Sequence, residues 1–111
     1  MDLVRQAQDF IEKANASPDS PATYILQLSS GAYYVGATIN LLRRMWDHAD
    51  RTGGKTTRDT NPEALLFVEF HTSFTNARRR EAQIKRWSRA KKEAHAIGDQ
   101  EALSRLSHSR D

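Results

Sequence analysis

Two tyrosines, an arginine, a histidine and a glutamate form a set of side chains able to cut a phosphodiester bond. They are Tyr24, Tyr34, Arg44, His48 and Glu81. A phenol or an imidazole takes a proton from water, a guanidinium neutralises phosphate charge, and one carboxylate holds a divalent ion such as Mg²⁺ or Mn²⁺. These residue types therefore favour hydrolysis of a nucleic acid with one metal ion.

Arg44 and His48 are four residues apart within an apolar helical pattern that runs from Leu41 to Asp50. This spacing brings a guanidinium beside an imidazole, an arrangement that gains nothing internally and suits an anion. Arginine is the better residue for such a contact because its planar fork grips two phosphate oxygens at once. The alternative, two unrelated surface residues, stays open at this point.

Glu81 has helical spacing with the apolar residues Ala77 and Ile84, so we expect it to lean toward the packed side of its helix. An inward carboxylate costs free energy unless a positive group meets it. Arg78 and Lys85 are placed to supply ordinary ion pairs, and a bound hard cation is the other candidate. Both interpretations of Glu81 stay open.

Tyr34 lies two positions before a strand glycine, Gly36. A phenol is a poor base unless nearby cations lower its pKa, and Arg44 together with a metal-bound water would provide that field. Packing of a half-buried ring is the ordinary alternative for a strand tyrosine. Glycine within a strand often marks the close approach of a ligand, so we expect nucleic acid to contact Gly36.

Positive charge is concentrated in one late segment. The 111 residues carry a net charge of +3, but residues 78–92 hold eight Lys/Arg and one Glu, whereas residues 1–22 hold four acids and two bases. This asymmetry predicts a face that binds DNA or another polyanion, with a solvated basic helix as the alternative. The expected phosphate contacts in this segment are Arg78, Arg79, Lys85, Arg86, Arg89, Lys91 and Lys92.

Several other classes of site are excluded. The chain has no cysteine, which removes disulfides and thiolate metal sites and suits the cytoplasm, where we expect the protein to be. The four histidines lack any zinc spacing, and no nucleophile-elbow motif is present. No segment approaches the ~18–20 apolar residues of a membrane span, and the start of the chain lacks a signal-peptide pattern. We therefore expect no membrane partner.

Hydrophobic periodicity predicts the elements that position these side chains. We expect helices over residues 2–14, 41–50, 76–87, 89–97 and, weakly, 100–106, and strands over 24–28, 33–35 and 64–72. Thr38 or Asn40, Thr75 and Ser88 are the expected helix caps. The buried stripe of the second helix should contain Leu41, Leu42, Met45, Trp46 and Ala49. The order of elements predicts an α/β (α+β) fold, a three-stranded sheet of antiparallel type sandwiched by helices, with an extra N-terminal helix.

Gly31 predicts a three-residue hairpin loop over residues 29–31, because such a loop ends on a left-handed residue. This loop length places Tyr24 opposite Gly36. Tyr34 then becomes a diagonal neighbour of Tyr24 on the same face of the sheet. A two-residue loop would reverse this arrangement.

Taken in this order, the segments resemble the GIY-YIG nuclease superfamily, especially its small stand-alone bacterial members. Ala22-Thr23-Tyr24 stands where the family has Gly-Ile-Tyr, and Tyr34-Val35-Gly36 stands where it has Tyr-Ile-Gly. The helix from Leu41 resembles the one that carries the family's catalytic Arg and His, which maps them to Arg44 and His48. Residues 77–92 resemble the most distinctive family segment and place its metal-binding Glu at Glu81.

The resemblance implies a metal-dependent DNA endonuclease that uses one Mg²⁺ or Mn²⁺ ion held by Glu81. Tyr34, assisted by Tyr24 or His48, would take the proton of the attacking water. Lys55 and Arg58 lie in a segment that resembles the polar loop of the stand-alone members, and we expect them to contact DNA.

The resemblance also implies three parts of the chain: an accessory helix and linker over 1–21, a nuclease domain over 22–97 and a tail over 98–111. A catalytically weak nucleic-acid-binding module of the same fold is the alternative, because Ala37 and Ala49 stand where family members often carry Lys and Asn. A protein-interaction adaptor that uses the N-terminal helix is a third reading. The preferred nucleic acid, RNA included, and the oligomeric state stay open.

Overall fold

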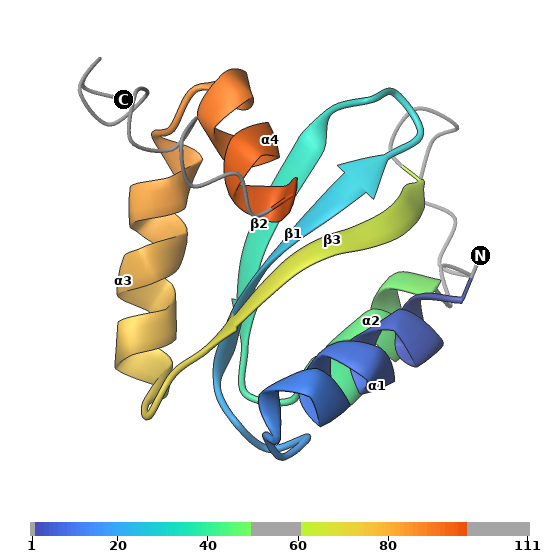
Figure 1. The fold of residues 1–111 in the computed structure, drawn as a ribbon, viewed down its shortest axis with the longest axis vertical. Helices are drawn as coiled ribbons and strands as arrows, with labels where there is room; N and C mark the ends of the chain where they lie inside the picture. Colours follow the sequence, from blue (N-terminus) through green and yellow to red (C-terminus); the bar gives the residue numbers. More distant parts are fainter. Residues whose placement is uncertain (1, 50–60, 98–111) are drawn as a thin grey trace.

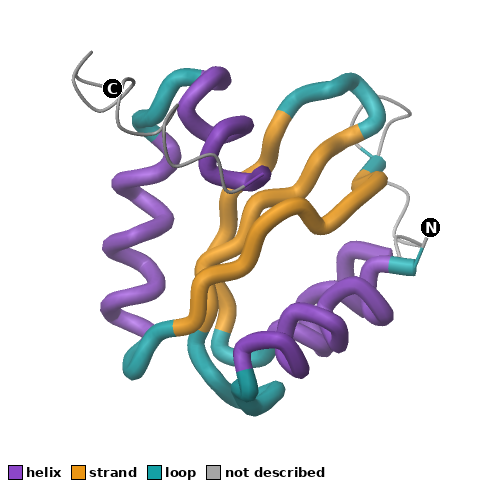
Figure 2. The backbone as a smooth tube through the Cα atoms, in the orientation of Figure 1, coloured by secondary structure: helices purple, strands orange, loops and turns teal. Residues whose placement is uncertain are grey.

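A three-stranded antiparallel sheet separates two pairs of helices (Figure 1). The computed structural model describes residues 2–49 and 61–97. The elements are α1 (Leu3–Ala14), β1 (Ala22–Leu28), β2 (Tyr33–Thr38), α2 (Leu41–Ala49), β3 (Pro62–Phe70), α3 (Phe74–Lys85) and α4 (Arg89–Ile97). The strand order is β2-β1-β3, and Figure 2 shows α1 and α2 on one side of the sheet with α3 and α4 on the other. The predicted fold class is confirmed.

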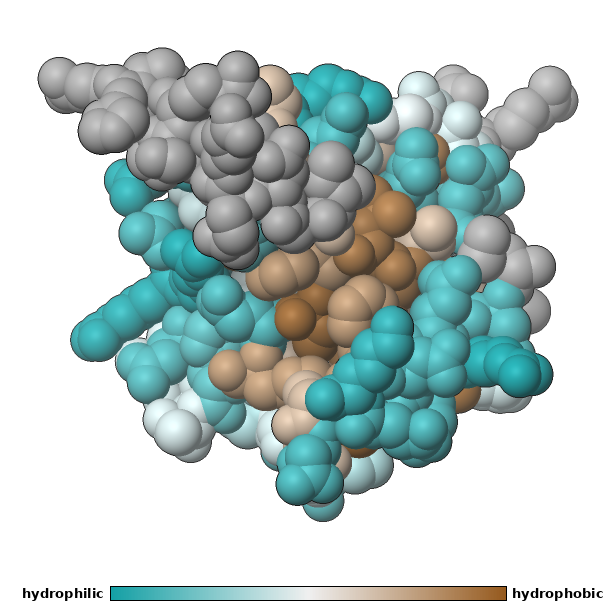
Figure 3. Space-filling model, in the orientation of Figure 1, coloured by the Kyte–Doolittle hydropathy of each residue, from teal (hydrophilic) through white to brown (hydrophobic). Residues whose placement is uncertain are grey.

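Each face of the sheet has its own apolar core, because successive side chains of a strand point to opposite faces. One core joins α1 and α2 to the sheet through Leu3, Ala7, Ile11, Tyr24, Leu26, Leu41, Met45 and Leu65. The other joins α3 and the turn that follows it to the sheet through Ile25, Val35, Ile84 and Trp87. Figure 3 shows apolar side chains gathered at the centre of that view, between polar outer surfaces.

The hairpin has the predicted loop and register. Gly31 has φ +89, the left-handed conformation that glycine adopts without steric cost. The amide of Leu28 donates to the carbonyl of Ala32 at 2.9 Å. Tyr24 therefore pairs with Gly36, as the loop length predicted.

The first helix is built into the core beside β3. Leu3, Ala7 and Ile11 are all buried on one side of α1. The side chain of Gln6 also accepts a hydrogen bond from the backbone amide of Leu65 at 2.8 Å, close to an irregularity in the pairing of β1 and β3. α1 thus covers the same face of the sheet as α2.

The buried stripe of α2 differs from the predicted one. Trp46 is 58% exposed and Ala49 is exposed, whereas His48 is buried among Leu41 and Met45. The prediction weighed hydropathy alone, but a hydrogen bond of His48 to the sheet turns the helix toward that side. Of the two predicted caps, Asn40 caps α2 by accepting from the amide of Arg43 at 2.9 Å.

The third strand and the third helix both begin two residues earlier than predicted. Ser73, in an extended conformation, caps α3 by accepting from the amide of Asn76, so the predicted cap at Thr75 is wrong. Ser88 does cap α4, since its hydroxyl accepts from the amide of Lys91 at 3.1 Å. The predicted helix over 100–106 lies outside the described residues. No helix in the described part of the chain has the length and apolarity needed to cross a membrane.

Candidate active site

The hydroxyl of Tyr24 joins an arginine to a histidine. It accepts a hydrogen bond from Nε of Arg44 at 2.9 Å and lies 3.0 Å from Nε2 of His48. Because a guanidinium only donates, the proton of the phenol remains available for the imidazole nitrogen. Tyr24 comes from the central strand and the other two come from α2, so the contact fixes this helix to the sheet. Arg44 and His48 thus share the hydroxyl of Tyr24 as a hydrogen-bonding partner, as their four-residue spacing on one helix allows.

Gly36 provides the space for this hydroxyl. A Cβ atom at position 36 would lie 2.5 Å from the Tyr24 oxygen and 2.6 Å from the ring carbon that bears it. The ring of Tyr24 therefore passes directly over edge strand β2. The close approach expected at this glycine is made, in the first place, by a side chain of the protein itself.

Tyr34 lies on the open side of the same group. Its hydroxyl is 3.5 Å from Nη2 of Arg44, and its side chain is 36% exposed. The ring centroids of Tyr34 and Tyr24 are 6.2 Å apart, and those of Tyr34 and His48 are 5.5 Å apart. We call Tyr24, Tyr34, Arg44 and His48 the tyrosine cluster.

Burial raises the pKa of Tyr24 to about 12, and the hydrogen bond from Arg44 offsets only part of this effect. The pKa of Arg44 is raised in turn, chiefly by its hydrogen bond to Tyr24. At neutral pH, Tyr24 is therefore a neutral hydroxyl held between a cation and an imidazole. It is suited to positioning these groups rather than to acting alone as a base.

Glu81 lies on α3 with its side chain only 16% exposed. Its Oε2 is 2.9 Å from Nζ of Lys85, and its Oε1 is 3.6 Å from Nε of Arg78. Both ion pairs expected from helical spacing are thus present. The negative charge of Glu81 is the weakest of the effects that raise the pKa of Tyr24.

A metal ion at this site would have one protein carboxylate. Within residues 2–49 and 61–97, no three His, Cys, Asp or Glu side chains converge on a common point. Mg²⁺ characteristically takes one or two carboxylates and completes its shell with waters and substrate phosphates. The largely buried carboxylate of Glu81 fits that donor set, provided that Lys85 moves from Oε2 when the ion binds.

The expected phosphate-binding residues are not equivalent in the structure. Arg78 and Lys85 flank Glu81 with side chains 65% and 56% exposed, and Arg79 and Arg86 are exposed as well. These four can reach a polyanion without rearrangement of the helix.

Three basic residues of α4 are placed differently. Arg89 is exposed and stacks over the ring of Tyr33 at 4.6 Å, while Lys92 is half-buried. Lys91 is buried, with its ammonium 4.6 Å from the Trp87 ring, so it packs against the core. Lys55 and Arg58 lie outside the described residues.

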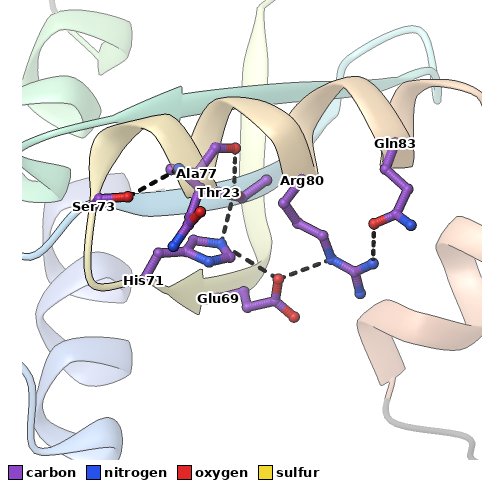
Figure 4. Close-up of polar contacts among 8 residues, drawn as sticks. Thr23, Glu69, His71, Ser73, Ala77, Arg80 and Gln83 are labelled. Atoms are coloured by element: carbon purple, nitrogen blue, oxygen red, sulfur yellow. Dashed lines mark hydrogen bonds and ion pairs between the residues drawn. The ribbon is translucent and has the colours of Figure 1, made fainter.

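A second polar group lies on the opposite face of β1 and was missed from the sequence (Figure 4). The hydroxyl of Thr23 donates to the carbonyl of Ala77 at 2.8 Å and lies 3.0 Å from Nε2 of His71. Figure 4 shows His71 and Arg80 converging on Glu69. Nε2 of His71 lies 3.4 Å and Nε of Arg80 lies 2.8 Å from Oε1 of Glu69. We call Thr23, Glu69, His71 and Arg80 the Thr23 network.

The Thr23 network fixes α3 to the sheet one helical turn before Glu81, because Ala77 precedes Glu81 by four residues. The sequence signal for it is the polar residue directly before Tyr24 in a mostly apolar strand. That signal does not identify partners 48 and 54 residues away.

Comparisons with known proteins agree with the predicted resemblance. The family model of the GIY-YIG catalytic domain matches residues 20–94. A UPF0213 protein of Halobacterium salinarum is 42% identical over 71 residues, which cover 64% of this chain and 92% of that protein. A UPF0213 protein of Syntrophus aciditrophicus is 39% identical over 70 residues, covering 62% and 80%.

Among solved structures, the solution NMR structure of a UPF0213 protein from Bacillus halodurans aligns with a TM-score of 0.46 and 34% identity, covering 79% of this chain and 97% of that one. The family match extends over more than half of the chain, and it includes the tyrosine cluster and Glu81. The chain therefore belongs to the GIY-YIG family, a family of nucleases, alongside the UPF0213 proteins.

Proposed function

We propose that this protein is a metal-dependent endonuclease that hydrolyses phosphodiester bonds of DNA. The observation that carries the proposal is the convergence of Arg44 and His48 on the hydroxyl of Tyr24 above Gly36. The charge of Glu81 acts on the same hydroxyl. A cation, an imidazole and two phenols thus gather on one face of β1 and β2, and the matched family region also includes the carboxylate of Glu81 on α3.

Arg44 would stabilise the charge that builds on the phosphate oxygens during cleavage. Its Nε is held by Tyr24 and its Nη2 faces the exposed hydroxyl of Tyr34, so its outer edge is oriented toward the open side of the cluster. A guanidinium fixed in this way loses little freedom when it binds phosphate. Losing such a contact typically lowers a rate by ~10²–10³.

Tyr34 would first lose its hydroxyl proton to solvent, with Arg44 beside the phenolate, and would then take the proton of the attacking water, since it is the exposed phenol of the cluster. His48 would assist by accepting a hydrogen bond from the hydroxyl of Tyr24. This bond keeps the oxygen of Tyr24 directed toward Arg44. Glu81 would hold one Mg²⁺ or Mn²⁺ ion, which when bound supplies Lewis-acid stabilisation of the leaving oxygen. Lys85, released from Glu81, would then face the phosphate.

The test is cleavage of labelled single-stranded, duplex and branched DNA and of RNA, in Mg²⁺, Mn²⁺ or EDTA. We expect metal-dependent products from the wild type and a loss of at least ~10²-fold in Glu81→Ala, with binding retained. Glu63→Ala is the matched control, because Glu63 is an exposed carboxylate of β3. If Glu81→Ala reduced binding and cleavage equally, the role assigned to Glu81 would be wrong.

A second candidate is a nucleic-acid-binding module with the same fold and little catalysis. The observation that favours it is the pairing of both Glu81 oxygens with Lys85 and Arg78, as in a carboxylate that only supports its helix. Salt-sensitive DNA binding without cleavage in either metal would support this candidate over the endonuclease.

A further inference from the structure

One flank of α3 carries a continuous row of interacting side chains that includes Glu81. Phe74, Arg78, Glu81 and Lys85 follow one another at spacings of four, three and four residues, which places them on the same side of a helix. The guanidinium carbon of Arg78 lies 5.8 Å from the Phe74 ring centroid, and Arg78 and Lys85 both pair with Glu81. We call these four residues the α3 row.

Phe74 is the unusual member of the α3 row. It is 37% exposed and belongs to neither of the two apolar cores formed by the described residues. A single exposed apolar side chain is ordinary on a protein surface. This ring, however, has a cation against it and stands in line with the proposed metal ligand.

Arg80, which lies outside the α3 row, is held by contacts within the protein. Arg80 donates to Glu69 and to Gln83, and its guanidinium carbon also lies 5.0 Å from the Trp87 ring centroid. Arg79 and Arg86 are exposed elsewhere on this segment, but the α3 row combines an exposed ring, an exposed cation and the proposed metal ligand.

The length of the α3 row matches a few nucleotides. An α-helix rises ~1.5 Å per residue, so Phe74 lies ~10 Å along the axis from Glu81. A stacked strand advances ~3.4 Å per nucleotide, so this span corresponds to about three nucleotides. A strand whose phosphate lies between Glu81 and Arg44 would thus bring a neighbouring phosphate to Arg78 and a base to Phe74.

We propose that Phe74 is a stacking surface for an unpaired base of the substrate, within about three nucleotides of the cleaved bond, and that Arg78 binds the phosphate between them. The inference rests on the proposed function and deepens it by naming the substrate class. Bases of an intact duplex are already stacked on both faces, whereas an unpaired base can lie on an aromatic ring. The substrate is therefore single-stranded, or opened, beside the scissile phosphate.

Trp46 provides a matched control. It is more exposed than Phe74, but it lies two residues from Arg44 on α2, and residues at that spacing do not share a helix face. Replacing either aromatic residue with leucine removes an exposed aromatic ring and leaves both apolar cores intact.

The first experiment measures the affinity of the full chain for single-stranded and duplex DNA of the same sequence, in EDTA so that no strand is cut. We expect Phe74→Leu to weaken single-strand binding by about tenfold and duplex binding by less than about twofold. Trp46→Leu should change neither, and Phe74→Tyr should keep the wild-type ratio. Thermal melts of all variants establish that each is folded.

The second experiment locates the base by photocrosslinking single-stranded DNA that contains 5-iodouracil, followed by mass spectrometry of the peptides. A crosslink at Phe74 is expected. A crosslink at Trp46 with none at Phe74, or an unchanged affinity ratio in Phe74→Leu, would overturn the proposal. These readouts need no catalysis: a wild type that binds and crosslinks without cleaving would refute the endonuclease and leave the stacking surface intact. A wild type that binds no DNA would refute both.

Discussion

The two faces of strand β1 carry two polar groups that differ in how their positive charge is paired. In the Thr23 network, the positive Arg80 meets the negative Glu69, and the hydroxyl of Thr23 has both a donor and an acceptor partner. In the tyrosine cluster, Arg44 contacts two phenols and, in the described part of the chain, no carboxylate. Positive charge there is held in place without being neutralised.

This difference separates a group that stabilises the fold from the group that we propose as the active site. A buried network whose donors, acceptors and charges are matched gains rigidity and has nothing left to offer a substrate. A guanidinium held by neutral hydroxyls keeps its full attraction for an anion. Because Thr23 and Tyr24 are consecutive, one strand delivers both kinds of group, one on each face.

The strongest way to break the tyrosine cluster is Gly36→Ala. The new Cβ would lie 2.5 Å from the Tyr24 oxygen, so the ring must leave its place and both of its partners. We expect cleavage to fall by at least ~10²-fold and the free energy of unfolding to drop by ~1–3 kcal/mol. Initial cleavage rates and urea unfolding measure the two effects. Wild-type cleavage by this variant would show that the position of Tyr24 does not matter.

The comparison is sharpest between Tyr24→Phe and Thr23→Val, which each remove one buried hydroxyl from the same strand. Both should lose ~1–2 kcal/mol of unfolding free energy, because each leaves hydrogen-bonding partners unpaired. Only Tyr24→Phe should lower cleavage, by ~10²-fold or more, since Arg44 and His48 lose their common partner. Unfolding curves and cleavage rates of the two variants, measured side by side, provide the check. Equal loss of cleavage in both would remove the distinction between the two faces.

High pH should weaken the fold through Tyr24. Its pKa is raised to about 12 in the folded protein, against ~10 for an unfolded tyrosine, because burial disfavours the phenolate. The stabilisation is fully present below pH ~10 and is lost as the pH rises to about 12, by ~2–3 kcal/mol. Urea unfolding of the wild type and of Tyr24→Phe across this range isolates the contribution. Parallel pH profiles for the two proteins would contradict it.

The smallest expected effects separate two basic residues, one directly after α3 and one on α4. Arg86→Ala should weaken DNA binding a few-fold and reduce the salt slope by ~1, because Arg86 is exposed. Lys91→Ala should instead lower the melting temperature, because Lys91 is buried over Trp87. Salt titrations of DNA binding and thermal melts measure both. A reversed pattern would mean that α4 opens when DNA binds.

Local signals predicted the hairpin well. Gly31 fixed the loop length, and the loop length fixed which residue faces Gly36, so the gathering of the two tyrosines followed from sequence alone. The segments with strong local chemistry, such as the cap at Ser88, were also predictable.

Features that depend on distant partners were not predictable. Hydropathy placed Trp46 in the core, but the hydrogen bond between His48 and Tyr24 orients α2 and leaves Trp46 outside. The charge pattern predicts that Lys91 lies on the surface. Its burial against Trp87 depends on how α4 packs, which the pattern does not show. The role of Glu81 also stays a proposal, since a metal ion and a lysine both favour the same inward carboxylate.

The position of β1 between two other strands affects how often each strand opens to solvent. Its backbone amides are bonded on both sides and should exchange with solvent as slowly as global unfolding allows, while the outward amides of edge strand β2 should exchange much sooner. Tyr24 therefore stands on the slowest segment of the sheet, and Tyr34 stands on a faster one. In the proposed mechanism, the strand that carries the exposed Tyr34 therefore fluctuates more often than the strand that carries Tyr24, the partner of Arg44 and His48.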